Sequence, residues 1–263
     1  MRLKGKTAIV TGGGRGLGRA AALALAREGA NVIVAARTAT EIERVAGEIR
    51  ALGSPALPIQ TDVSDAAAVK AMVGETVDQF GTVDILVNCA GVIGPIGLVS
   101  QIEAEEWEAA ISINLTGTFL CCQAVLEPMM AQNKGKIVNV SSGIGTRVYP
   151  RFTAYGVSKA GVNYLTRNLA AEVQEFNVDV NAMNPSVTET RMQEEIRAVP
   201  LKFIGQQYFD RFHGLWEKGQ LYSPEEPARL ILFLASPASD GLTGQYLSFS
   251  DEKVQAMIVQ ATD

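Results

Sequence analysis

The stretch YGVSK at residues 155–159 places a tyrosine and a lysine four residues apart. Side chains with this spacing face the same side of a helix, and a helical pattern runs over residues 154–176. A nearby ammonium group favours the phenolate and is expected to lower the tyrosine pKa from about 10 toward neutrality. Tyr155 could then serve as a general acid or base. Taken alone, the same spacing also fits an ordinary pair on a helix surface.

Two further polar residues stand where they could join this pair. Ser142 ends the strand-like run KIVNVSS (136–142), and Asn114 lies in a helical pattern at 103–132. Each has a plain alternative, because a serine often caps a strand end and an asparagine can simply interrupt a helix. Ligands of parallel sheets bind beyond the carboxyl ends of the strands, which favours one shared site.

A glycine-rich turn, TGGGRGLG at 11–18, follows the first strand-like run and precedes a helical pattern. This context predicts a turn that holds the pyrophosphate of a dinucleotide at a helix N-terminus, with a plain flexible turn as the alternative. The second strand ends at Arg37 and Thr38, with no acid for the ribose hydroxyls. Arg37, assisted by Arg15, suits a 2′-phosphate, so NADP(H) is predicted over NAD(H). The alternative for Arg37 is a solvated surface charge.

Alternating apolar runs and helical patterns predict the elements that position these residues. The runs are nearly continuous in Val and Ile, as in strands buried on both faces of a parallel sheet. Strand–helix–strand repetition predicts an α/β fold with a doubly wound sheet of about seven strands in a single domain, 1–263. Strands are predicted at 7–12, 31–36, 56–63, 83–91, 136–142, 178–185 and 244–250, and helices at 16–29, 40–52, 65–80, 103–132, 154–176 and 224–236.

Composition narrows the class of protein. The 263 residues are 47% hydrophobic and 19% charged, and the net charge of −5 gives no electrostatic footprint for nucleic acid or an anionic membrane. We expect charged residues to interrupt every apolar stretch well before it reaches the length of about 20 residues that a membrane span needs.

Three cysteines without disulfide or zinc spacing fit a reducing cytoplasm, and no metal site is predicted. With one histidine, His213, and no Gly-x-Ser-x-Gly, a hydrolase is a weak alternative.

Residues 191–222 interrupt the regular pattern and contain six of the 17 aromatic residues. Either they form helices packed on the sheet edge or another subunit, or they form a variable lid over a partly apolar substrate. The two interpretations are compatible. The aromatic residues are Phe203, Tyr208, Phe209, Phe212, Trp216 and Tyr222.

Over nearly its whole length the sequence resembles the short-chain dehydrogenase/reductase family, and most of all its 3-oxoacyl-carrier-protein reductase branch. Each motif alone is common, but together they are specific. The matching motifs are Thr-Gly-x3-Gly-x-Gly at Thr11, Gly12, Gly16 and Gly18, the adenine-contacting acid Asp62 beside Val63, Asn88-Cys89-Ala90-Gly91, Asn114, Ser142, Tyr155 with Lys159, and Asn184-Pro185-Ser186 with Thr188 and Thr190.

The resemblance implies a Rossmann fold, an oxidoreductase acting on a carbonyl or secondary alcohol, and a homotetramer or homodimer. Tyr155 would exchange a proton with the substrate oxygen, Ser142 would bind that oxygen, Lys159 would hold the nicotinamide ribose, and Asn114 would support a water chain. The implied cofactor-binding residues are Thr11, Gly12, Gly14, Arg15, Gly16, Leu17, Gly18, Arg37, Thr38, Asp62, Val63, Asn88, Ala90, Gly91, Tyr155, Lys159, Pro185, Ser186, Thr188 and Thr190.

The chain departs from the family pattern at three places. Cys89 replaces an asparagine, Ser186 replaces a glycine, and the C-terminal SFSDEKVQAMIVQATD replaces Val-Asp-Gly-Gly. An NAD-dependent alcohol, sugar or steroid dehydrogenase of the same fold remains an alternative. A dinucleotide-binding sensor without turnover is a weaker one, since Tyr155 and Lys159 are both present.

Overall fold

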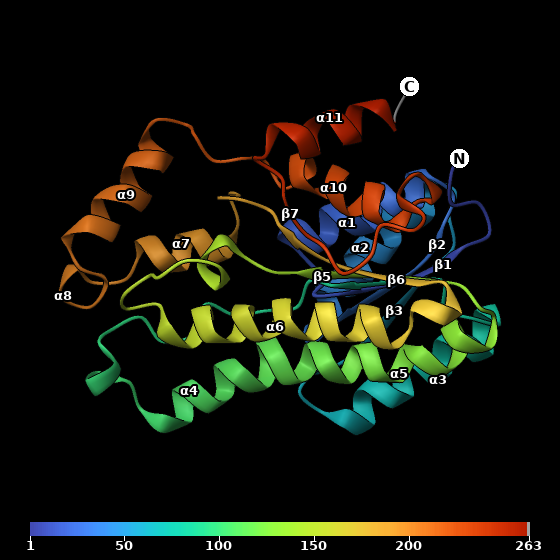
Figure 1. Ribbon diagram of the computed structural model, residues 1–263, viewed down its shortest axis with the longest axis horizontal. Helices are drawn as coiled ribbons and strands as arrows, with labels where there is room; N and C mark the ends of the chain where they lie inside the picture. Colours follow the sequence, from blue (N-terminus) through green and yellow to red (C-terminus); the bar gives the residue numbers. More distant parts are fainter. Residues whose placement is uncertain (262–263) are drawn as a thin grey trace.

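A seven-stranded parallel sheet forms the centre of the molecule (Figure 1). In this computed structural model, which describes residues 1–261, the strand order is β3-β2-β1-β4-β5-β6-β7. The order reverses between β1 and β4, and ligands of such sheets bind in the crevice at this switch point. The strands are β1 Thr7–Thr11, β2 Asn31–Ala36, β3 Ala56–Gln60, β4 Ile85–Asn88, β5 Gly135–Val140, β6 Val178–Asn184 and β7 Tyr246–Ser248.

The seven predicted strands and the parallel sheet are confirmed, but β3 and β4 end three residues earlier than predicted, and four other strands end one or two residues earlier. β3 stops at Gln60 because the backbone N–H and hydroxyl of Ser64 both donate to Asp62, which turns the chain out of the sheet. β4 stops at Asn88, where the next two backbone N–H groups bond to Thr11 of the neighbouring strand. Both early ends turn the following residues into loops at the edge where ligands bind.

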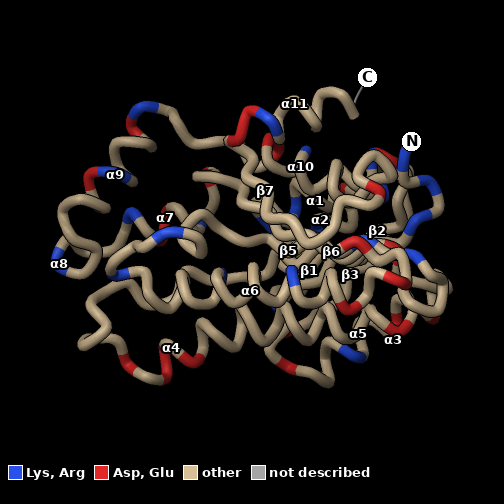
Figure 2. Tube along the Cα trace, viewed as in Figure 1, with Lys and Arg blue, Asp and Glu red and all other residues tan. Residues whose placement is uncertain are grey.

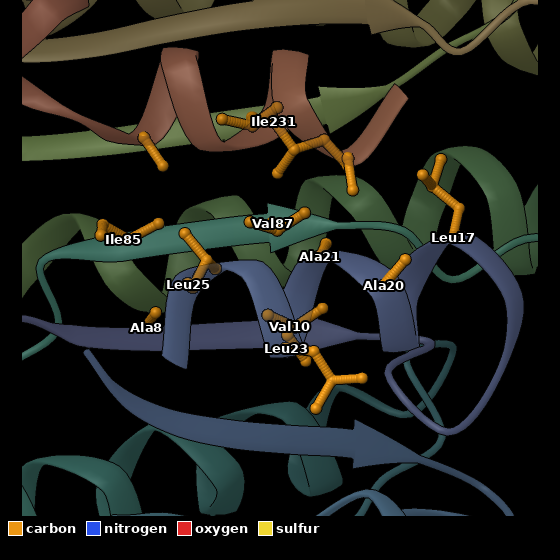
Figure 3. Close-up of a cluster of buried hydrophobic side chains, with 14 of the residues drawn as sticks. Ala8, Val10, Leu17, Ala20, Ala21, Leu23, Leu25, Ile85, Val87 and Ile231 are labelled. Carbon is orange, nitrogen blue, oxygen red and sulfur yellow. The ribbon is translucent and has the colours of Figure 1, made fainter. Parts of the chain in front are cut away.

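Helices cover both faces of the sheet, and each face has its own apolar core (Figure 1). Alternate residues of one strand point into opposite cores: Ala8 and Val10 pack with one cluster and Ile9 with the other. Figure 3 shows the first cluster, where α1 lies against β1 and β4 with Ile231 of α10 beyond. This face carries α1 Gly16–Arg27, α2 Ala39–Ala51 and α10 Glu225–Ala235, and the other carries α3 Ala66–Phe80, α5 Gly117–Ala131 and α6 Thr153–Glu172.

The helix predicted at 103–132 is not uniform. A π-helical segment, Ser112–Thr116, joins α4 (Ala104–Ile111) to α5. Charge interrupts this helix later than expected, because Ala104–Ala131 contains an 18-residue window with a mean hydropathy of 1.6, long and apolar enough to span a membrane. A core helix meets the same criteria of length and composition, and Cys121, Val125 and Met129 of α5 pack against the sheet.

Residues 191–222, which we call the lid segment, form helices at one end of the molecule (Figure 1). These are α7 Arg191–Arg197, α8 Leu201–Ile204 and α9 Gln206–Glu217. The unusual C-terminal sequence forms α11, Glu252–Gln260, which was not predicted. Asp251 caps it by accepting from the Lys253 backbone N–H at 2.9 Å, and Val254 and Ile258 bury one face against the core.

Candidate active site

A cleft of about 700 Å³ opens at the carboxyl ends of the strands. The structure brings nearly all of the predicted site residues together in its wall; Thr11, Asn88 and Asn114 lie outside it. Residues that are separated by up to 178 positions in the chain therefore share one site. The predicted residues in the wall are Gly12, Gly14, Arg15, Gly16, Leu17, Gly18, Arg37, Thr38, Asp62, Val63, Ala90, Gly91, Ser142, Tyr155, Lys159, Pro185, Ser186, Thr188 and Thr190.

Two glycines of the turn, Gly12 and Gly18, leave no room for a side chain. A Cβ atom on Gly18 would lie 2.2 Å from the backbone oxygen of Gly12, and one on Gly12 would lie 2.8 Å from the backbone of Ala90. Gly12 also has a φ of 64°, which disfavours other residues. At these two glycines the turn consequently presents backbone beside the N-terminus of α1, the arrangement that binds phosphate.

Thr11 and Asn88 support the cleft from behind. The Thr11 hydroxyl accepts from the backbone N–H groups of Cys89 and Ala90, each at 3.2 Å. The Asn88 amide donates to Asn139 at 2.9 Å, and both side chains are buried. These two residues hold β1, β4 and β5 together at their carboxyl ends.

The outer end of the cleft, beyond β2 and β3, carries exposed charge. Arg37 is exposed, and its guanidinium charge contributes to the lowered pKa of Asp62, which is mainly due to hydrogen bonds from Ser64. Arg15 lies 3.4 Å from Glu41, an acid in the first turn of α2 that also lines the cleft. Sequence reasoning missed Glu41, although its place four residues after Arg37 put it on the helix that follows β2.

Tyr155 and Lys159 lie side by side in the deep part of the cleft. The Lys159 ammonium is 5.7 Å from the centre of the Tyr155 ring, and both residues are buried. Lys159 donates to the backbone oxygen of Val140 at 2.7 Å, which fixes it against the end of β5.

The electrostatics of this pair differ from the expectation. Burial raises the pKa of Tyr155 to about 12, although a hydrogen bond with Ser142 opposes the rise. Burial also lowers the pKa of Lys159 to about 8. The expected lowering of the tyrosine pKa by its lysine is therefore not produced within the polypeptide, because loss of hydration outweighs it.

Asn114 lies just behind this pair, within the π-helical segment. Its side-chain amide pairs with the backbone N–H and C=O of Val92, both at 2.8 Å, and donates to Ser158 at 3.1 Å. A Cβ atom on Gly91 would be 3.2 Å from the Asn114 oxygen and 3.7 Å from the Lys159 nitrogen. The missing side chain of Gly91 thus lets asparagine and lysine approach the same point.

The loop after β6 closes the site opposite Tyr155. Ser186, in place of the family's glycine, has a φ of 63°, and its backbone N–H donates to Asn184 at 3.0 Å. The loop thus keeps a left-handed conformation at a strain of about 1 kcal/mol for a serine. Thr188 donates to the Pro185 oxygen at 3.0 Å, and a Cβ on Gly16 would meet the Thr190 methyl at 3.3 Å.

Cys89, the second departure, is half-buried and lines the cleft. Burial raises the pKa of its thiol to about 12, so it remains protonated near neutral pH. Among residues 1–261 no group of three or more His, Cys, Asp or Glu side chains is placed to hold a metal ion.

The lid segment divides its aromatic residues between packing and the cleft. Tyr208 and Phe212 are buried with Phe152 and Ile196 in a third apolar cluster that includes Tyr155. Of the six predicted aromatics only Phe212 lines the cleft, while Phe203 and Trp216 are exposed. His213 stacks on Phe209 and does not line the cleft. Cleft residues that sequence reasoning missed include Ile144, Arg147, Tyr149, Gln193, Arg211 and Tyr246.

Comparisons with known proteins show the family to which the chain belongs. The family model for short chain dehydrogenase matches residues 6–200. A 3-oxoacyl-[acyl-carrier-protein] reductase of Synechocystis is 39% identical over 92% of this chain and 94% of its own, and the Thermotoga maritima protein of that name is 37% identical over 94% and 97%.

Solved structures match over the same extent. NAD⁺-bound xylitol dehydrogenase and levodione reductase each superpose with a TM-score of 0.88 at 29% identity. The first match covers 94% of this chain and 98% of the other, and the second covers 97% and 100%. With its parallel sheet, glycine turn and Tyr155–Lys159 pair, the chain belongs to the short-chain dehydrogenase family.

Proposed function

We propose that this short-chain dehydrogenase transfers hydride between NADP(H) and a carbonyl or secondary-alcohol substrate, acting mainly as a ketone reductase. The observation that carries the proposal is that Tyr155, Lys159 and Ser142 share one cleft with the glycine turn. Among the relatives are 3-oxoacyl-[acyl-carrier-protein] reductases and levodione reductase, whose names describe reduction of a carbonyl.

The cleft fits a nicotinamide dinucleotide. Its glycine turn exposes backbone where a Cβ on Gly12 or Gly18 would collide with neighbouring backbone, so the surface is formed for close contact with a phosphate. Two buried polar atoms that line the same cleft, Ser186 Oγ and Gln193 Oε1, have no hydrogen-bond partner among the described residues. Both are available to a polar group of a bound ligand.

Arg37 supports NADP(H) over NAD(H). It stands exposed at the end of β2, where its guanidinium can form paired hydrogen bonds with a 2′-phosphate. Glu41 is the observation that favours NAD(H) as the second candidate, since its carboxylate lines the cleft and pairs with Arg15 at 3.4 Å. A phosphate at this place would compete with Glu41 for Arg15.

Proton transfer falls to Tyr155. A nicotinamide held in the cleft would supply the hydride, two electrons with one hydrogen, that the carbonyl carbon accepts. Tyr155, whose pKa of about 12 keeps it protonated at neutral pH, donates its phenolic proton to the carbonyl oxygen and so completes the secondary alcohol. Oxidation of an alcohol would use the same residue as the phenolate, which accepts the proton.

Three other side chains assist this proton transfer. Ser142 is hydrogen-bonded to Tyr155 and is placed to bind the same substrate oxygen. Lys159, held at the Val140 oxygen, is placed to bind the ribose hydroxyls and stabilise the phenolate once it forms. Asn114, fixed at Val92 and close to Lys159, is placed to support the return of a proton from water.

A panel of ketones that includes 3-oxoacyl thioesters tests the proposal, with absorbance of NADPH and of NADH as the readout. We expect faster turnover with NADPH, and a Tyr155→Phe variant should lose at least about 100-fold in kcat/KM while binding the cofactor as before. Full activity of Tyr155→Phe on every substrate would overturn the mechanism. Cofactor binding without any turnover would favour the sensor alternative.

The predicted homotetramer or homodimer also remains a proposal. Two long helices expose large apolar side chains, Phe119 on α5 and Val157 and Tyr164 on α6. Such a surface supports burial against a second copy.

A further inference from the structure

Two arginines line the cleft beside Tyr155 without an acidic partner. Arg147 follows the 3₁₀ turn Gly143–Gly145 that begins after Ser142, and Arg211 lies on α9 of the lid segment. Among the described residues, neither takes part in an ion pair. The Arg211 guanidinium lies 6.0 Å from the ring centre of Tyr149, which also lines the cleft.

The other charged residues of this part of the cleft do not neutralise the two arginines. Arg191 and Glu195 of α7 line it as well, but they form an ion pair with each other at 3.3 Å. Asp62 and Glu41 lie at the opposite end, with Arg37 and Arg15. The lid end of the cleft is therefore positive in a chain whose net charge is −5.

The charge of the cleft differs from that of other parts of the surface. In Figure 2 the lid helices carry both basic and acidic residues, whereas α4 carries only acidic ones. A cleft lined by charge of one sign focuses the field and attracts a ligand of the opposite sign.

Apolar side chains form the wall between Tyr155 and the arginines. Ile93, Ile144, Met192 and Ile196 line the cleft, together with Phe212. A ligand that reached from Tyr155 to Arg147 or Arg211 would lay an apolar segment on this wall. Its far end would meet two guanidinium groups from different elements, a geometry suited to carboxylate or phosphate oxygens.

We propose that the substrate is an anionic ketone, in which an apolar segment separates the carbonyl group from a carboxylate or phosphate that Arg147 and Arg211 bind. This inference rests on the proposed function, because it places the carbonyl at Tyr155. It assigns the two arginines to substrate selection, while Tyr155, Lys159 and Ser142 act on any carbonyl that reaches them.

Matched pairs of ketones test the inference. The pairs are 4-oxopentanoate and 5-oxohexanoate with their methyl esters, and 4-hydroxy-2-butanone phosphate with 4-hydroxy-2-butanone; the last pair separates phosphate from carboxylate. We expect the wild type to prefer at least one anion over its neutral partner by about tenfold or more in kcat/KM, since charge-assisted hydrogen bonds are strong. In an Arg147→Gln, Arg211→Gln double variant this ratio should fall to about one.

Arg167→Gln is the matched control. Arg167 is also exposed and also lies 6.0 Å from a tyrosine ring centre, that of Tyr164, but it does not line the cleft. This variant should keep the wild-type anion preference. A ratio is the readout because a general loss of folding or cofactor binding would lower both rates together.

Calorimetric binding of each acid and ester, with NADP⁺ present, gives a second readout that needs no turnover. Equal binding and turnover of anion and neutral partner in the wild type would overturn the inference, and so would an anion preference that survives in the double variant. These outcomes differ from failure of the proposed function, in which no ketone in any form is reduced with NADPH or NADH.

Discussion

The two ends of the cleft are built from different materials. At the glycine-turn end, residues 11–18, the glycines present main chain beside the side chains of Arg15 and Leu17, and a Cβ at Gly18 would overlap the backbone oxygen of Gly12. At the lid end the surface consists of side chains from separate elements, such as Tyr149, Phe212 and Arg211. The shape of the first end therefore depends on the absence of side chains at Gly12 and Gly18, whereas the shape of the second end depends on which side chains line it.

This difference explains how proteins that share one fold can bind the same cofactor and yet differ in the substrate that they bind. A backbone surface recognises groups common to all dinucleotides, and almost any substitution damages it. A side-chain surface can be altered one residue at a time while the sheet stays intact. Tyr155 is buried in the apolar cluster of the lid end, and Lys159 is buried beside it.

The largest effect should come from a single methyl group at the backbone end. Gly18→Ala should lower the free energy of unfolding by about 3 kcal/mol or more and reduce NADPH affinity at least about 100-fold, because the colliding atoms are main chain. Denaturant unfolding and fluorescence titration with NADPH measure the two effects.

Gly47→Ala is the control for this experiment. Gly47 is inside α2, and a Cβ there would meet no atom within 4 Å. Alanine should stabilise that helix by up to about 1 kcal/mol and leave cofactor binding unchanged. If Gly18→Ala behaved like Gly47→Ala, the contrast between the two ends of the cleft would be wrong.

The buried pair should make stability depend on pH. The pKa of Lys159 is lowered to about 8 in the folded state from an ordinary 10.5, so between these values the unfolded chain binds more protons and stability rises with pH. Below pH 8 both states are protonated and the full burial penalty, on the order of 3 kcal/mol, is present. Lys159→Met should therefore stabilise the protein most below pH 8, with the gain shrinking toward pH 10.

Urea unfolding of the wild type and Lys159→Met between pH 7 and 10 measures this gain. The range stops at pH 10 because Tyr155, with its pKa raised from 10 to about 12, makes stability fall above that value. Parallel stability curves for the two proteins would show that Lys159 is not a titrating buried group.

The smallest effects should come from exposed charges at the outer end of the cleft. Arg37→Asp should weaken NADPH binding about tenfold and leave NADH binding unchanged, because the 2′-phosphate loses its guanidinium partner. Glu41→Gln should strengthen NADPH binding roughly a few-fold, because Arg15 is then no longer paired with Glu41 and can bind the phosphate. Fluorescence titration with both cofactors measures the changes, and Glu43→Gln, which removes an acid of α2 outside the cleft, is the control. Unchanged NADPH affinity in Arg37→Asp would remove Arg37 from the 2′-phosphate site.

Much of the fold and the arrangement of the site could be predicted from local sequence. The strands are continuous runs of Val and Ile because both faces are buried, as Val10 and Ile9 illustrate. The motifs that end these strands, including Gly12–Gly18 and Ser142, meet at one edge because parallel strands place all their carboxyl ends there. Asp251 and the spacing of Val254 and Ile258 would have predicted α11 as well.

Other features depend on burial and on contacts between residues that are far apart in the chain, which local sequence does not predict. Lys159 is four residues from Tyr155, but the degree of burial decides that the pKa of the tyrosine rises instead of falling. Arg211 and Arg147 are 64 residues apart, and only the folded lid segment brings both to the cleft. Thr11 and Asn88 are motif residues whose partners, Ala90 and Asn139, show that they support the wall from behind.

The π-helical segment Ser112–Thr116 makes the helix from Ala104 to Ala131 sensitive to insertions and deletions. Loss of one residue there would restore regular α-helical hydrogen bonding, and α4 would keep its orientation to α5, because a π-helical turn holds roughly one residue more than an α-helical turn. The loss would fall on the wider turn itself, which carries Asn114 and its bonds to Val92. The number of residues in this segment therefore matters for the site as much as the types of those residues.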